Sequence, residues 1–161
     1  MRKIITLLLM ASFSFGAEIE VTADKFRASE SEQQGVFTGN VTVTKGEDLL
    51  KSDKLIIFFD ENKDPLKYEA TGNASVKMKL NDMHYFGEGE VLVYEPKNMR
   101  YTIKKSGFLH EIETDRKVYG DLIVADQNSG TYEVDSKESE PVKFIFHVEE
   151  EKEPSEGLLE K

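Results

Sequence analysis

The chain contains no cysteine. Disulfide bonds therefore cannot stabilise it, and no thiol is present to carry a lipid after a signal sequence. Basic residues are also scarce, since 21 Lys and Arg stand against 31 Asp and Glu and give a net charge of −10. Proteins that bind nucleic acid need a basic stripe that displaces counterions, so this acidic balance argues against a nucleic-acid partner.

Long apolar runs are lacking except at the N-terminus. There, two basic residues precede the apolar stretch 4–11, and small residues follow until the acidic start at Glu18. This order predicts a secretory signal peptide over residues 1–17, cleaved after Gly16 or Ala17. Because spanning a bilayer takes roughly 20 apolar residues, the stretch favours a cleaved signal over an anchor. We therefore expect a soluble, exported chain.

Motifs for catalysis or cofactor binding are missing as well. The three histidines, His84, His110 and His147, fall on separate predicted strands without the spacing of metal ligands. Carboxylates are frequent, but no pair is distinguished as an acid and a base. No nucleophile elbow, phosphate loop or dinucleotide fingerprint occurs. The sequence predicts neither an enzyme nor a metal or cofactor site.

The clearest pattern present is an alternation over residues 67–80. Apolar or small residues occupy every second position, and polar residues occupy the positions between them. Period-two alternation of this length predicts a long antiparallel strand with one buried face. The inner positions are Tyr68, Ala70, Gly72, Ala74, Val76, Met78 and Leu80.

The pattern belongs to a repeat. The segment TGNVTV at 38–43 returns as TGNASV at 71–76, and we place a weaker echo at 106–109. A second motif, an acidic residue near an apolar run, is interleaved with the first at 52–60 and 87–95. A further copy lies at 120–126, so the chain reads as a repeated strand pair. Aligning the copies predicts that Ile56, Phe58, Val91 and Val93 face inward.

Strands are predicted along the whole mature chain, and no segment favours a helix. We expect one domain over residues 18–149, after the signal peptide, and an acidic tail over 150–161. The fold class expected is all-β: a single antiparallel β-jelly-roll, or open twisted roll, built from repeated strand pairs. The predicted strands are 18–24, 36–45, 53–60, 67–80, 83–95, 99–112, 117–126, 131–134 and 141–149.

In their order, the signal peptide, the two TGN segments, GEGEVLVYE at 87–95 and GDLIVAD at 120–126 resemble the LptA/OstA family of periplasmic lipopolysaccharide transport proteins. The third TGN is replaced by KSG at 105–107. The resemblance implies a jelly-roll that carries lipopolysaccharide across the periplasm of Gram-negative bacteria. It also implies an LptC-like inner-membrane partner, an LptD-like outer-membrane partner and head-to-tail self-association.

Acyl chains in water cost about 0.8 kcal/mol per exposed methylene, so a carrier of this kind needs an apolar groove. The same residue types also build an ordinary closed core, and both readings stay open here. The residues expected in the lipid-binding groove are Phe37, Val41, Val43, Ile56, Phe58, Val76, Met78, Leu80, Val91, Val93, Tyr101, Ile103, Phe144 and Phe146.

End-to-end assembly would use strands at the sheet edges, and the expected edge residues are Ile19, Val21, Phe144 and Phe146. Three alternatives remain. One is an inner-membrane-anchored LptC-like relative, and another is a periplasmic β-roll with a structural or interaction role and no lipid. The third is a periplasmic enzyme, which would depend on polar residues such as His84, His110 and Glu90.

Overall fold

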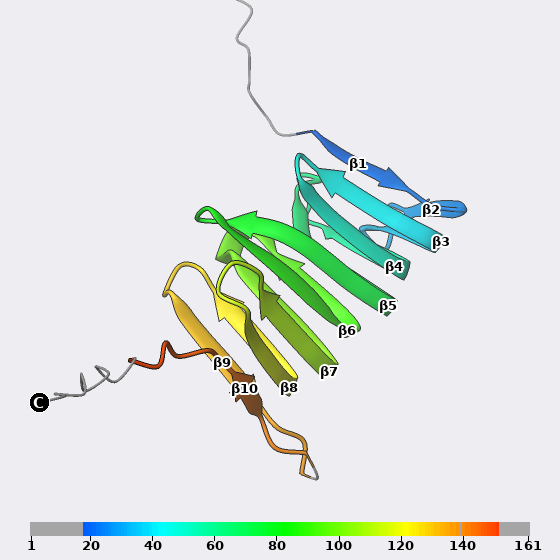
Figure 1. The fold of residues 1–161 in the computed structure, drawn as a ribbon. Coiled ribbons are helices and arrows are strands. Elements are labelled where there is room, and N and C mark those ends of the chain that lie inside the picture. Colours follow the sequence, from blue (N-terminus) through cyan, green and yellow to red (C-terminus); the bar gives the residue numbers. More distant parts are fainter. Residues whose placement is uncertain (1–17, 139, 152–161) are drawn as a thin grey trace, which may run out of the picture.

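The computed structural model describes residues 18–138 and 140–151 (Figure 1). The expected signal peptide and most of the acidic tail lie outside these residues. Within the described part, no helix has the length and apolar character needed to cross a membrane. The elements are β1 (Ile19–Thr22), β2 (Lys25–Ser29), β3 (Gln34–Lys45), β4 (Asp48–Phe59), β5 (Pro65–Leu80), β6 (Met83–Glu95), the short 3-10 helix η1 (Pro96–Asn98), β7 (Arg100–Glu111), β8 (Arg116–Asp126), β9 (Thr131–Asp135) and β10 (Lys143–Ile145).

All the strands belong to one antiparallel sheet. β3 to β8 pair in chain order, each with the next, as expected for strands joined by short turns. At one end, β1 and β2 both pair with β3, and at the other end β9 and β10 both pair with β8. The prediction of an all-β antiparallel roll is confirmed. The last strand is shorter than the predicted 141–149.

A line of β-bulges crosses this sheet. In β3, β5 and β7, two adjacent residues have a left-handed backbone, and the pairing register shifts beside each pair. A bulge bends its strand and increases its twist, so bulges at one level bend the whole sheet along a line. Figure 1 shows the long strands curving accordingly. We call these residues the bulge row: Gly39 and Asn40, Gly72 and Asn73, and Lys105 and Ser106.

Carboxylates on neighbouring segments hold the first two bulges. The Asn40 side-chain amide donates a hydrogen bond to Asp24 Oδ2 over 3.0 Å, and the Asn73 amide donates to Asp53 Oδ2 over 3.1 Å. Asparagine tolerates the left-handed region better than most residues. The repeated Gly-Asn pair therefore has a structural reason, which is the bend it makes.

The third bulge corrects the sequence alignment. Lys105 and Ser106, with φ of 62° and 55°, occupy the positions that Gly72 and Asn73 occupy in β5. The third repeat therefore lies 33 residues after the second, as the second does after the first. The echo predicted at 106–109 is two residues too late, and the replacement KSG at 105–107 is one residue too late. The polar substitutes hid the equivalence, because neither residue is typical of a positive φ.

Replacing Lys105 with glycine should stabilise the fold. A side chain in the left-handed region costs about 1 to 2 kcal/mol, and the greater freedom of glycine in the unfolded chain offsets part of this gain. We expect the free energy of unfolding in urea to rise by about 0.5 to 1 kcal/mol. The matched change Lys104→Gly, one residue earlier in the same strand, should lower it instead. Equal effects at the two positions would contradict the bulge geometry.

The bulge row divides the sheet into two arms. The first arm comprises 41–52, 74–89 and 107–120, and the second comprises 34–38, 54–71, 91–104 and 122–135. The inner faces of the arms meet in a core of buried apolar residues near the bend. Its members are Val41, Leu55, Ile57, Ala70, Ala74, Leu92, Ile103 and Ile123.

The bend also changes which side chains of β4 and β6 face inward. In β4, Leu55 and Ile57 are buried in the core, whereas Ile56 and Phe58 are outside it. In β6, Leu92 joins the core while Val91 does not. The inward prediction for Ile56, Phe58 and Val91 was wrong, because the alignment matched Leu55 with Glu90 and so placed Leu55 on the outer face beyond the bulge level. The inner positions of these strands shift by one residue there.

Candidate functional site

An apolar groove opens between the inner faces of the two arms. Its volume is about 390 Å³, within the range of ligand pockets in proteins, so the side chains of the chain do not fill it. Buried core residues line its deepest part: Leu55, Ala70, Leu92, Ile103 and Ile123. The first arm contributes Val43, Leu50, Val76, Met78, Leu80, Tyr85 and Leu109, and the second arm contributes Tyr68, Val93, Tyr94, Tyr101, Ala125 and Tyr132.

Stacked tyrosines form one wall of the groove. The Tyr94 ring lies 4.4 Å from the Tyr101 ring and 6.0 Å from the Tyr68 ring, measured between centroids. Burial raises the pKa of both Tyr68 and Tyr101 above the ordinary value, and Tyr94 adds to the rise. On the opposite arm, burial and the Glu111 carboxylate raise the pKa of Tyr85 to about 12. These phenols are therefore neutral at physiological pH and suit an apolar ligand.

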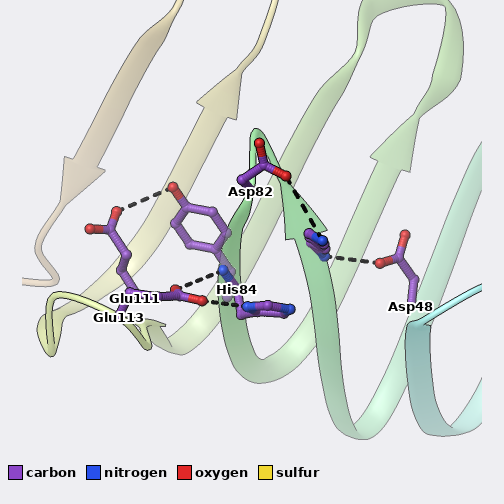
Figure 2. A network of polar contacts seen from close by, with 7 residues as sticks. Asp48, Asp82, His84, Glu111 and Glu113 are labelled. Carbon is purple, nitrogen blue, oxygen red and sulfur yellow. Dashed lines mark hydrogen bonds and ion pairs between the residues drawn. The ribbon is translucent and has the colours of Figure 1, made fainter.

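Charged groups lie where the groove meets solvent. Asp48 borders the groove, and its Oδ1 accepts a hydrogen bond from the Lys79 backbone N–H over 2.9 Å, which joins two neighbouring strand ends (Figure 2). At the other arm, Asp126 forms an ion pair with Arg100 over 3.1 Å. A backbone hydrogen bond from Ser129 and the Arg100 guanidinium lower the pKa of the Asp126 carboxyl. The Asp126 carboxylate therefore stays ionised, and the contacts of Asp48 and Asp126 tie strand ends together.

Seven residues predicted for the groove line it in the structure. Phe37 and Val41 pack in or against the core instead. Phe144 lies beside Val118 in the register, so it is on the groove side of the sheet, but at the edge and 54% exposed. Phe146, 57% exposed, is likewise not part of the groove wall. The seven lining residues are Val43, Val76, Met78, Leu80, Val93, Tyr101 and Ile103.

Three deep groove residues were missed: Leu55, Leu92 and Ile123. Each follows an acidic residue by two positions, namely Asp53, Glu90 and Asp121 in turn. That spacing was available in the sequence as a signal. The alignment of Glu90 with Leu55 conceals it, because Glu90 stands at the level of the bulges, as Asp53 does.

The histidines gather at the strand ends of the first arm. Both the backbone N–H and Nδ1 of His84 contact the Glu113 carboxylate (Figure 2). His110 Nε2 and His147 Nε2 lie 2.8 and 3.0 Å from the two oxygens of Asp115. Each ring therefore has a carboxylate partner. Among the described residues, no group of three or more His, Asp or Glu could hold a metal ion.

Comparison with known protein families assigns the chain to a family. Residues 20–131 match the family described as "LptA/(LptD N-terminal domain) LPS transport protein". The chain belongs to this family. The match covers most of the described part and includes β3 to β8, which build the groove. This lipopolysaccharide transport protein therefore has the fold and family that its repeats predicted.

A solved structure agrees on the fold. The crystal structure of LptH, described as the LptA homologous periplasmic component of the conserved lipopolysaccharide transport device from Pseudomonas aeruginosa, superposes with a TM-score of 0.71. The two chains share 17% identity, and the match covers 82% of this chain and 96% of LptH. Comparison with curated protein sequences gives no significant match. The fold is thus kept at an identity where few side chains agree.

Proposed function

We propose that this protein is a periplasmic carrier that shelters the acyl chains of lipopolysaccharide in the groove. The observation that carries this proposal is an open apolar groove in a member of a lipopolysaccharide transport family. Burying methylene groups is favourable by about 0.8 kcal/mol each, so the groove can hold acyl chains that water would not. The proposed role is transport without chemistry, and no cofactor is required.

We propose further that copies or partners extend the groove. The groove runs across the strands, from the β1 end of the sheet toward the β9 end, because residues of both ends line it. Ile19 of β1 and Tyr132 of β9 are among them. A cavity of about 390 Å³ is small for a lipid with several acyl chains, so a longer groove serves the cargo better.

Both ends of the sheet expose strand edges that can accept another strand. Ile19 and Phe144 are exposed at opposite ends. The partners proposed for these edges are an LptC-like inner-membrane protein, an LptD-like outer-membrane protein and a second copy of this chain. A photo-crosslinker placed at Ile19 or Phe144 in the periplasm should capture one of them. Capture of none from either position would refute the bridge and leave the carrier role standing.

Lipopolysaccharide binding should depend on the apolar character of the groove wall. Met78 lines the groove, and the change Met78→Gln keeps its length while adding a polar amide. We expect the affinity for purified lipopolysaccharide to fall about tenfold, since burying a methionine is worth about 1.5 kcal/mol or more. The measurement is a titration monitored by intrinsic fluorescence or native mass spectrometry.

The neighbouring residue supplies the control. Lys77 is exposed on the outer side of the same strand, so Lys77→Gln introduces the same amide outside the groove. Its affinity should equal that of the parent chain. If both variants bind alike, or if protein isolated from its native periplasm carries no lipopolysaccharide in native mass spectrometry, the carrier proposal is wrong.

A further inference from the structure

Two short strands divide the outer edge of β8 between them. β9 pairs with residues 122–126, and β10 pairs with residues 117–119. β10 has only three paired residues, and its side chains are largely exposed: Phe144 is 54% exposed and Ile145 is 37% exposed. A strand with so little buried surface opens at low cost in free energy. β10 is therefore the element most easily removed from this edge.

Two side-chain contacts hold the β10 segment in place. His147 Nε2, just beyond the strand, lies 3.0 Å from Asp115 Oδ2 in the turn before β8. The Lys143 ammonium lies 4.6 Å from the centre of the Tyr119 ring. Asp115 also contacts His110 Nε2 over 2.8 Å and Lys117 Nζ over 3.2 Å, so it keeps partners when His147 leaves. The carboxylate can release the segment without becoming isolated.

We propose that β10 is a removable cover, and that β1 of a second copy takes its place on β8. The inference rests on the end-to-end assembly proposed above and goes beyond it, because it assigns the accepting strand and a competitor within the same chain. In the free protein, the C-terminal segment occupies the edge that an incoming copy needs. Assembly then requires the segment to leave.

The charge pattern of the two strands supports this exchange. β8 begins with Arg116 and Lys117, whereas β1 contains Glu20, and Glu18 directly precedes β1. β10 places the apolar Ile145 opposite Lys117. A carboxylate opposite Lys117 would form an ion pair across the two strands. An opposite-charge pair stabilises strand pairing more than the pair of Lys117 with the apolar Ile145 does. An incoming β1 therefore suits the β8 edge better in charge than β10 does.

The alternation of β1 fits the groove as well. Ile19 lines the groove and Val21 packs against the core, so both lie on the inner face, where Val118 of β8 also lies. With these apolar side chains on one face, Glu20 falls on the outer face together with Lys117. The exchange would continue the apolar inner face from one copy into the next.

The position of the contact can be mapped directly. A photo-crosslinker at Ile19 in the purified mature chain should, on irradiation, join a second copy at residues 116–119, as read by mass spectrometry of the crosslinked peptides. Crosslinks at residues 143–145 instead would mean that β10 itself accepts the strand, and they would overturn the proposal. An intermolecular crosslink at neither segment would overturn it too.

A reversible lock tests whether β10 must leave. Tyr119 and Lys143 are paired across the strands, and the chain has no native cysteine, so Tyr119→Cys with Lys143→Cys forms a unique disulfide. We expect self-association, measured by sedimentation velocity, to be about tenfold weaker in the oxidised protein than in the same protein after reduction. Equal association in the two states would refute the removable cover.

Two histidine variants complete the test. His147→Ala should strengthen self-association about threefold, as expected from the loss of one exposed side-chain hydrogen bond that holds the cover. His110→Ala removes the other histidine on Asp115 without touching β10 and should leave association unchanged. If the wild type, the reduced lock and His147→Ala all stay monomeric, the proposal fails. Lipopolysaccharide carriage by the same samples is a separate readout, which fails only if the carrier function itself is wrong.

Discussion

Replacing Gly72 with alanine is expected to lower the free energy of unfolding by about 2 to 4 kcal/mol. Gly72 has a φ of +78°, where a side chain is strained, and an added Cβ would stand 2.5 Å from Asp53 Oδ2 and 2.8 Å from Asp53 Cβ. The carboxylate would have to move, which breaks its hydrogen bond with Asn73. Urea unfolding followed by circular dichroism measures the loss.

A second glycine separates strain from collision. Gly46, in the turn between β3 and β4, has a φ of +58°, and a Cβ there would meet no atom within 4 Å. Gly46→Ala should therefore lower the free energy of unfolding only by the backbone strain, about 1 kcal/mol. If the two substitutions were equally harmful, the contact between Gly72 and Asp53 would not be a determinant of the bend.

Replacing Leu55 with alanine is expected to lower the free energy of unfolding by about 3 kcal/mol, within the range measured for buried leucines. Leu55 is 1% exposed and belongs to the core cluster between the arms. Removing its side chain leaves a space that the strands cannot close, because they are held by pairing on both sides. Chemical denaturation of the variant and of the parent chain gives the difference.

The adjacent residue tests the assignment of faces. Ile56 is half-buried and lies outside the core cluster, so Ile56→Ala should cost about 1 kcal/mol. If Ile56→Ala lowered the free energy of unfolding more than Leu55→Ala does, Ile56 would face inward, as the sequence alignment predicted. That result would contradict the shift in alternation at the bulge level.

Much of the fold follows from the sequence. Alternation over residues 67–80 predicts β5, and the two TGN segments, 33 residues apart, predict a repeated strand pair. Alternation reports a strand reliably, because the two faces of a sheet differ in exposure and successive side chains sit on opposite faces. The groove residues Val76, Met78 and Leu80 were found for the same reason.

The faces of β4 and β6 could not be read in this way. Their apolar runs, such as 55–59, lack alternation, so the inner face depends on the register with neighbouring strands. That register changes at the bulge row, and in β7 the bulge consists of Lys105 and Ser106, which do not resemble Gly-Asn. Burial of Leu55 and Leu92 is therefore set by pairing across the sheet.

Contacts between residues far apart in the sequence could not be predicted either. Asp115 brings together His110 and His147, which are separated by most of the C-terminal third of the chain. No local spacing predicts that these rings share one carboxylate. The division of the β8 edge between β9 and β10 likewise depends on where the chain returns to β8 after β9.

The regular line of bends has an architectural consequence. Because the bulges recur at the same level in β3, β5 and β7, an added strand pair of this kind would continue the same bend, and each added strand would lengthen the groove by about 4.8 Å. A duplication of one 33-residue unit would therefore extend the groove without changing the bend of the sheet. Chains of different length can be built from this one design by gaining or losing whole units.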